Sequence, residues 1–232
     1  MSRLARVTQA EERLDQPQSD VRLLEQSLRH VAQVNRWLGG DRSVMRVLRQ
    51  SDPRQPLALL DIGTGSAALP RRIVHWARRS QRAITVRATD VHPQTLALAR
   101  QACRDYPEII VENANALQLP YQSGTFTHAL LTLTLHHFND AEQLIVLREL
   151  VRVSRQAAVV SELERGWPNY LGSRLLAATW WRRNPITRHD GPLSVLRAFT
   201  PAELAAVAHR AGLQTTVQRG FFYRLLLVIP AQ

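Results

Sequence analysis

The stretch LALLDIGTGSAALP, residues 57–70, places two glycines directly after a short apolar run. The run Leu57–Ile62 has the length and composition of a buried strand, and the residues from Ala67 onward suit a helix. Without a Cβ, Gly63 can form the tight turn between them and Gly65 can let a ligand lie against the main chain, while the free N–H groups of the following helix attract an anion. This pattern favours an open α/β sheet that binds its ligand at the carboxyl ends of parallel strands.

Strand and helix patterns alternate through the rest of the chain. Strands are predicted at residues 57–62, 83–90, 108–113, 126–135 and 156–163, and helices at residues 67–80, 93–106, 140–153 and 200–212. This order predicts a mostly parallel sheet with helices on both faces. Residues 213–220 and 221–230 are predicted as two strands joined at Arg219 and Gly220, which adds one antiparallel C-terminal strand. The predicted fold is therefore α/β, a Rossmann-like doubly wound sheet.

Two further segments accompany this core. Apolar residues recur at helical spacing from Val21 to Leu38, and a second short helix is predicted at residues 42–49. The insertion after the fifth strand is too rich in aromatic and apolar residues for a solvated loop, so we expect it to fold over the pocket as a lid. The predicted limits are 1–52 for an N-terminal helical cap, 53–232 for the Rossmann-like domain and 166–199 for the lid insertion.

Composition restricts the remaining possibilities. The net charge is +11 and all 30 basic residues are arginine, but they are scattered along predicted helices, so we interpret them as solvated faces and expect no nucleic-acid partner. Only the stretch 179–189, TWWRRNPITRH, interleaves arginines with aromatics. The single cysteine, Cys103, excludes an internal disulfide and a cysteine zinc site, and no metal site is predicted. No apolar run reaches the roughly 18 residues that span a bilayer, and no secretory signal is visible, so we expect a cytoplasmic monomer or homodimer.

Asp90 adds information about the ligand. It ends the second predicted strand, where an acidic side chain takes both ribose hydroxyls of a nucleotide cofactor and disfavours a 2′-phosphate. Read with Ala68, the two glycines even fit a dinucleotide fingerprint. These residues suit NAD and S-adenosylmethionine alike.

Four motifs distinguish these cofactors. The segments LLDIGTGSA, ATDVHPQTLALAR, NANALQLPYQSGTFTHALLTLTLHHF and ELVRVSRQAAVVSELER follow one another in order and spacing between about residues 57 and 165. In this order they resemble the successive motifs of class I S-adenosylmethionine-dependent methyltransferases. The helices ahead of the first strand and the C-terminal hairpin are also similar to that family, whereas an NAD oxidoreductase usually begins with its glycine strand. The resemblance implies S-adenosyl-L-methionine as the cofactor.

The resemblance also implies roles for individual residues. Asp61 would lie near the methionine amino group, Asp90 would bind the ribose, and Asn115 would stand beside the adenine, where the family usually has an aspartate. An asparagine can still meet the adenine amino group through its carbonyl oxygen. The cofactor-binding residues implied in this way are Asp61, Gly63, Thr64, Gly65, Asp90, Val91, Asn115, Ala116 and Thr132. A purely structural role in capping helices or turns stays open for both aspartates.

The acceptor site is expected at the end of the fourth strand, in TLTLHHFND. The stretch has neither an Asn/Asp-Pro-Pro-aromatic motif nor a nucleophilic cysteine, which argues against methylation of a base amino group or of cytosine C5. His136 and His137 here, with His189 in RHDGPLS, are the candidates for a catalytic base, although the pair could equally cap the strand. Aromatic residues of the insertion are either walls of an apolar acceptor site or ordinary helix packing: Trp167, Tyr170, Trp180 and Trp181.

A finer resemblance concerns the substrate. The insertion, with ERLD and NRWLGG near the N-terminus, resembles small-molecule methyltransferases of bacterial secondary metabolism, some of them encoded beside type III polyketide synthases, and more loosely the ubiquinone and menaquinone methyltransferases. It implies a small, aromatic or polyketide-like acceptor, with oxygen favoured over carbon. Two alternatives stay open: an RNA or protein methyltransferase, and a non-catalytic S-adenosylmethionine-binding regulator.

Overall fold

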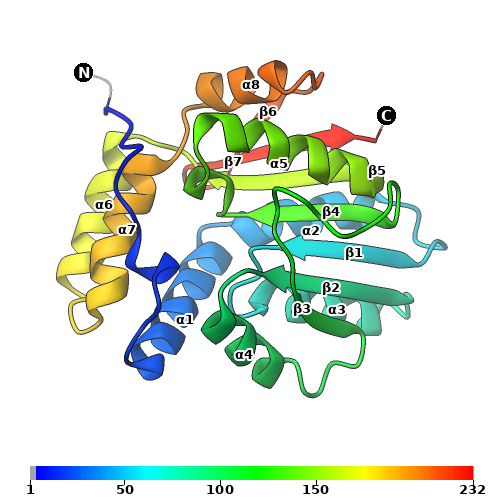
Figure 1. The fold of residues 1–232 in the computed structure, drawn as a ribbon, viewed down its shortest axis with the longest axis horizontal. Helices are drawn as coiled ribbons and strands as arrows, with labels where there is room; N and C mark the ends of the chain where they lie inside the picture. The colour runs from blue at the N-terminus through cyan, green and yellow to red at the C-terminus, as the bar shows by residue number, and fades with distance from the viewer. Residues whose placement is uncertain (1–3, 232) are drawn as a thin grey trace.

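A computed structural model describes residues 4–231 as one seven-stranded sheet with helices on both faces (Figure 1). The strands are β1 (Leu57–Ile62), β2 (Ile84–Asp90), β3 (Ile109–Asn113), β4 (Phe126–Thr132), β5 (Ser154–Leu163), β6 (Val217–Gly220) and β7 (Arg224–Pro230). Their order in the sheet is β3-β2-β1-β4-β5-β7-β6. The first five strands pair in parallel, and β7 runs antiparallel to both β5 and β6. The predicted α/β fold with one strand opposing the others is confirmed.

Two hydrophobic layers hold the helices against the sheet. Helices α5 (Asp140–Val153) and α8 (Pro201–Arg210) cover one face. Helices α2 (Gly40–Gln50), α3 (Ala68–Arg79) and α4 (Pro93–Ala102) cover the other. Because both faces are covered, the central strands β1 and β4 are almost continuously apolar and buried.

Three helices remain outside these layers. Helices α1 (Val21–Trp37), α6 (Trp167–Ala178) and α7 (Pro185–Arg197) gather at the end of the sheet toward which the parallel strands point (Figure 1). Helices α6 and α7 form the insertion predicted as a lid, folded as a helical hairpin that packs on α1. Between residues 4 and 231, no helix combines the length and the apolar character needed to cross a membrane.

The fourth strand is shorter than predicted. It ends at Thr132 because Leu133 adopts a left-handed backbone with φ of 54° and donates its N–H to the Ser161 carbonyl at 2.8 Å. The next residues form a short 3-10 helix, η2 (Leu135–His137). The two histidines therefore lie on a helical turn beyond the strand, and a helical turn directs neighbouring side chains differently from a strand.

The turn of the C-terminal hairpin also differs from the prediction. Arg219 and Gly220 were expected to form it, but both still pair with β7. The loop consists instead of residues 221–223, in which Phe222 and Tyr223 have φ of 46° and 53°. Such values are uncommon for bulky residues, so the hairpin closes through a strained three-residue turn.

Candidate functional site

A cavity of about 1120 Å³ opens at the carboxyl ends of the parallel strands. Its wall includes the loop after β1, the ends of β2 and β4, and the turn η2. Helices α1, α6 and α7 and the N-terminal segment, residues 4–20, complete it. The N-terminal segment is extended and includes the short 3-10 helix η1 (Arg13–Asp15). Segments that are far apart in the sequence thus enclose one space.

The loop after β1 is built around its two glycines. Gly63 has φ of +66°, and a Cβ there would stand 2.4 Å from Thr134 Oγ1. Gly65 has φ of +55°, but an added Cβ would meet only Leu28 Cδ2, at 3.5 Å. Gly63 is therefore required by packing, whereas Gly65 leaves open space beside its backbone on the cavity wall.

Asp90 ties this loop to β2. Its carboxylate accepts hydrogen bonds from the Gly65 N–H and the His92 N–H, both at 3.1 Å. Burial raises the pKa of Asp90, and these two hydrogen bonds oppose that rise. Asp90 thus caps the turns at Gly65 and His92, and its side chain also lines the cavity.

Asp61, at the end of β1, is buried beside the same loop. Burial raises the pKa of its carboxyl to about 7, against a lowering by the Thr64 hydroxyl, and the negative charges of Asp90 and Asp41 add to the rise. A carboxyl in this state gains most from a cationic partner, because a nearby positive charge favours its ionised form.

All nine residues predicted to bind the cofactor line this cavity: Asp61, Gly63, Thr64, Gly65, Asp90, Val91, Asn115, Ala116 and Thr132. Their convergence follows from the parallel sheet, which brings the strand ends to one edge. Asn115 Oδ1 accepts the Leu117 N–H at 2.9 Å, so its amide is held in its own turn.

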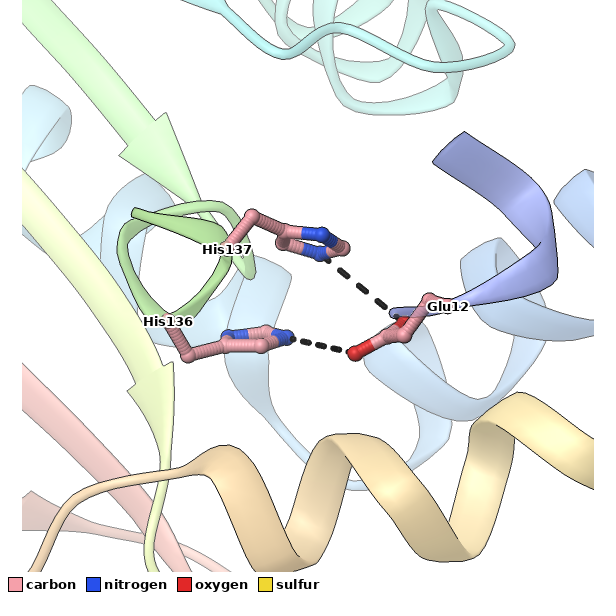
Figure 2. A group of neighbouring side chains, drawn as sticks. All are labelled: Glu12, His136 and His137. Atoms are coloured by element: carbon pink, nitrogen blue, oxygen red, sulfur yellow. Dashed lines mark ion pairs between the residues drawn. The ribbon is translucent and has the colours of Figure 1, made fainter. Parts of the chain in front are cut away.

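His136 and His137 line the cavity together with Glu12, an acidic residue that was not predicted as part of the site (Figure 2). His136 is buried, with Nδ1 2.8 Å from Glu162 Oε2 and Nε2 3.6 Å from Glu12 Oε1. His137 is partly exposed, with Nδ1 2.8 Å from Asp15 Oδ2 and Nε2 3.9 Å from Glu12 Oε2. Because a carboxylate only accepts hydrogen bonds, Nδ1 of each ring carries a hydrogen.

The charges around His136 and Glu12 keep the first protonated and the second ionised. Burial lowers the pKa of His136, but Glu162 and Glu12 outweigh this and raise it to about 10. Burial likewise raises the pKa of Glu12, yet His137 and His136 bring it down to about 2. His136 and Glu12 therefore form a buried ion pair at neutral pH.

Ligand atoms of Glu12, His136 and His137 all lie within 4.8 Å of one another, so the three side chains could also hold a metal ion. No metal site was expected from the sequence. Ligation by His136 would require loss of the proton that its two carboxylate neighbours favour.

The third histidine candidate lies apart from the other two. His189 does not line the cavity; its side chain is 43% exposed, and Nδ1 lies 2.7 Å from Asp190 Oδ1. Asp190 is buried and accepts the backbone N–H groups of Arg13 and Leu14, both at 2.9 Å. The RHDGPLS segment thus anchors the N-terminal segment instead of presenting His189 to the cavity.

The aromatic residues of the insertion divide in the same way. Trp181 is buried against Gly191 and lines the cavity. Trp180 instead stacks on Trp37 with ring centroids 5.3 Å apart, and Trp167 packs edge-on to Tyr170. Of the four proposed wall residues, only Trp181 is part of the wall.

Comparison with known proteins relates this site to one family. Residues 60–160 match the model of a methyltransferase domain. Over 97 residues the chain is 28% identical to a demethylmenaquinone methyltransferase of Bacillus licheniformis, a match that covers 42% of this chain and 41% of that protein. The chain thus spans about two fifths of the length of this curated relative.

Solved structures agree on the fold. An S-adenosylmethionine-dependent methyltransferase from Aquifex aeolicus superposes with a TM-score of 0.60 at 16% identity, over 81% of this chain and 89% of that chain. The CMeT domain of the citrinin polyketide synthase superposes with a TM-score of 0.59 at 15% identity, over 81% of this chain and 50% of that chain. At these identities the comparison establishes the shared fold.

Proposed function

We propose that the chain is a class I S-adenosylmethionine-dependent methyltransferase that acts on a small, partly apolar acceptor; the match of residues 60–160 to a methyltransferase domain supports this proposal. The observation that carries this proposal is the cavity. Its volume of about 1120 Å³ exceeds the roughly 300–1,000 Å³ typical of a pocket for one drug-sized ligand. One continuous wall contains both the glycine loop and the apolar helices α6 and α7, so a cofactor and an acceptor can share the space.

The residues of the loop after β1 fit the proposed cofactor. The open side of Gly65 admits a ligand against the backbone, Asp90 provides acceptors for ribose hydroxyls, and Asp61 offers a carboxyl for an amino group. S-adenosylmethionine supplies an electrophilic methyl group when bound. The chain's own contribution is to position the acceptor, to exclude water and to receive the acceptor's proton.

We assign the proton to His137. Asp15 accepts the hydrogen on Nδ1 of its ring, so Nε2 is the ring atom that can accept a proton, and the ring lines the cavity. His136 already carries a proton between Glu162 and Glu12, so its charge holds Glu12 in place instead of accepting a proton. An acceptor hydroxyl would lose its proton to His137 Nε2 as its oxygen takes the methyl group.

The lining supports the class of acceptor. Most of the exposed wall is apolar, and its lining includes Leu175, Leu176 and Trp181 from the insertion, with Leu14 and Val31 from the N-terminal part of the chain. A few polar groups also line the cavity, among them Asn169 and His137, and can orient a hydroxyl or carbonyl. An aromatic or polyketide-like hydroxyl compound satisfies both, and oxygen is favoured over carbon because a histidine base suits a phenol. A place in bacterial secondary metabolism rests on the sequence resemblance alone, and cytoplasmic location stays an expectation from the sequence.

The test is methyl transfer from labelled S-adenosylmethionine to a panel of phenolic polyketides, with the products detected by mass spectrometry. We expect a gain of one methyl group on at least one phenol. His137→Ala should keep S-adenosylhomocysteine affinity and lose about 10²- to 10⁴-fold in turnover, the range for general acid-base catalysis. His189→Ala, outside the cavity, is the matched control and should retain its rate.

Other outcomes support the alternatives. Methylation of RNA or protein without methylation of any phenol would favour a macromolecular substrate. Cofactor binding without transfer to any of these acceptors would favour a regulator. Equal turnover of the His137 and His189 variants would contradict the base assignment while leaving the methyltransferase assignment intact.

A further inference from the structure

Arg224 is a buried cation that the proposed reaction does not use. It is 1% exposed, it lines the cavity, and none of its three guanidinium nitrogens has a hydrogen-bond partner among residues 4–231. A buried charge without a partner is strongly destabilising, so native proteins retain one only where something else compensates it.

Neighbouring carboxylates do not provide that compensation. Glu162 and Asp41 are the acidic groups whose charges act on Arg224, but neither lies within ion-pair distance of it. Glu162 is engaged with His136 and with the Leu135 N–H at 2.7 Å. Asp41 is engaged with Arg72 at 3.0 Å and with Asn35 at 2.7 Å. Burial lowers the pKa of Arg224 to about 10, so the side chain is still charged at neutral pH.

The fold directs this side chain into the cavity. Arg224 is the first residue of β7 and pairs with Leu163 at the end of β5, which places it at the edge where the parallel strands end. It follows the strained turn at Phe222 and Tyr223, and residues 222–224 all line the cavity. Backbone strain of this kind is concentrated at ligand sites.

Two buried hydroxyls share its face of the sheet. Ser161 pairs with Leu226 of β7 and with Thr132 of β4, and side chains of paired residues point to the same side. Arg224 is two residues from Leu226 and so projects to that side as well. The hydroxyls of Thr132 and Ser161 also lack hydrogen-bond partners within the described chain.

We propose that Arg224 binds a carboxylate group of a molecule in the cavity. This proposal rests on the proposed function for the identity of that molecule. The planar guanidinium matches a carboxylate with two parallel N–H···O bonds. The carboxylate belongs to the methionine part of the cofactor or to the acceptor. Two strands, β4 and β5, lie between β1 and the strand of Arg224, and Arg224 is not among the charged groups that shift the pKa of Asp61. Arg224 is therefore not the ionic partner of Asp61.

The experiment compares Arg224→Met with wild type and with the control Arg219→Met, an exposed arginine of the same hairpin that pairs with Glu164 at 2.9 Å. The first measurement is the melting temperature without ligand. Arg224→Met should melt at or above the wild-type temperature, because it removes an unpaired buried charge. A melting temperature several degrees below wild type would overturn the proposal, since it would show that the guanidinium has stabilising contacts within the protein.

The second measurement is calorimetric binding of S-adenosylhomocysteine and of 5′-methylthioadenosine, which lacks the amino-acid carboxylate. If the cofactor supplies the carboxylate, Arg224→Met should bind S-adenosylhomocysteine about 10- to 100-fold more weakly and bind 5′-methylthioadenosine as wild type does. If the acceptor supplies it, both nucleosides should bind equally well to both proteins. Salicylate, added with saturating S-adenosylhomocysteine, should then raise the melting temperature of wild type and not of Arg224→Met.

Equal behaviour of both proteins toward all three probes would overturn the proposal. Failure of the proposed function looks different, because wild type itself would then bind neither nucleoside. In that case salicylate alone still tests Arg224 by the same comparison, and no difference between the two proteins would refute the carboxylate site.

Discussion

The affinity for S-adenosylhomocysteine should depend on the ionisation of Asp61. The ligand's amino group is cationic, and the resemblance to the family puts it beside this carboxyl. Burial, together with the negative charges of Asp90 and Asp41, raises the pKa of the Asp61 carboxyl to about 7, although the Thr64 hydroxyl lowers it. The ionised fraction of such a carboxyl rises about 25-fold between pH 5.5 and 7.5. Binding that requires the ionised form should tighten by about the same factor.

Calorimetric titrations at several pH values in this window measure that dependence. His136 and Glu12 do not titrate there, because their pKa values are shifted to about 10 and about 2. Asp61→Asn should bind more weakly and with little dependence on pH. The matched control Asp105→Asn, an exposed aspartate outside the cavity, should retain the wild-type slope. An unchanged slope in Asp61→Asn would refute the assignment of this carboxyl to the amino group.

The same shift has a consequence for stability. A carboxyl whose folded pKa exceeds its unfolded value of 3.8 favours the folded state below pH 3.8, and that contribution is lost as the pH rises through about 7. Without ligand, Asp61→Asn should therefore be more stable than wild type at pH 8, by up to about 4 kcal/mol, and no more stable near pH 4. Urea denaturation at both pH values tests the sign; destabilisation at pH 8 would contradict it.

Three further outcomes can be checked with the same preparations. Gly63→Ala should lower the melting temperature more than Gly65→Ala, because its Cβ would overlap Thr134. Gly65→Ala should lose about 1–2 kcal/mol of stability from its left-handed backbone, and it should reduce the rise in melting temperature caused by S-adenosylhomocysteine. His136→Gln should cost about 3–5 kcal/mol in urea denaturation because it leaves Glu12 and Glu162 buried without their cation, and a loss below 1 kcal/mol would contradict the ion pair. EDTA should leave the melting temperature and turnover unchanged; a fall in either would show that Glu12, His136 and His137 hold a metal.

Local patterns predicted most of the sheet, and they predicted nine residues that now lie around one cavity; cofactor binding by these nine residues stays a prediction. The strand Leu57–Ile62 and the helix Asp140–Val153 occupy the predicted residues, because apolar periodicity and the residues at their ends act over short distances. Thr200 and Glu203 form a capping box at the start of α8, where a helix was predicted from residue 200. The nine predicted cofactor residues meet because parallel strands end at one edge, a consequence of topology alone.

The remaining cavity wall could not be predicted in the same way. Glu12 lies in an extended segment without periodicity, and only the tertiary fold brings it to His136. The sequence favours a longer fourth strand because nothing in TLTLHHF signals the left-handed Leu133 that ends it. Arg224 is one of many arginines, and only its burial distinguishes it. Each of these residues depends on contacts between distant parts of the chain.

The N-terminal segment, residues 4–20, forms part of the cavity wall, and many of its attachments are polar. It is held by the Val7 N–H on the Leu196 carbonyl at 3.1 Å, by the Ala10 carbonyl on Arg197 at 2.6 Å, and by the amides that Asp190 accepts. Hydrogen bonds of this kind each contribute only about 0.5–1.5 kcal/mol, and the buried pair of Glu12 with His136 adds to them, so we expect the segment to open locally while the sheet stays folded. Deuterium uptake at Val7, Arg13 and Leu14 should then slow when the cavity is filled, which makes these amides a label-free readout for discovering the natural acceptor among crude metabolite fractions.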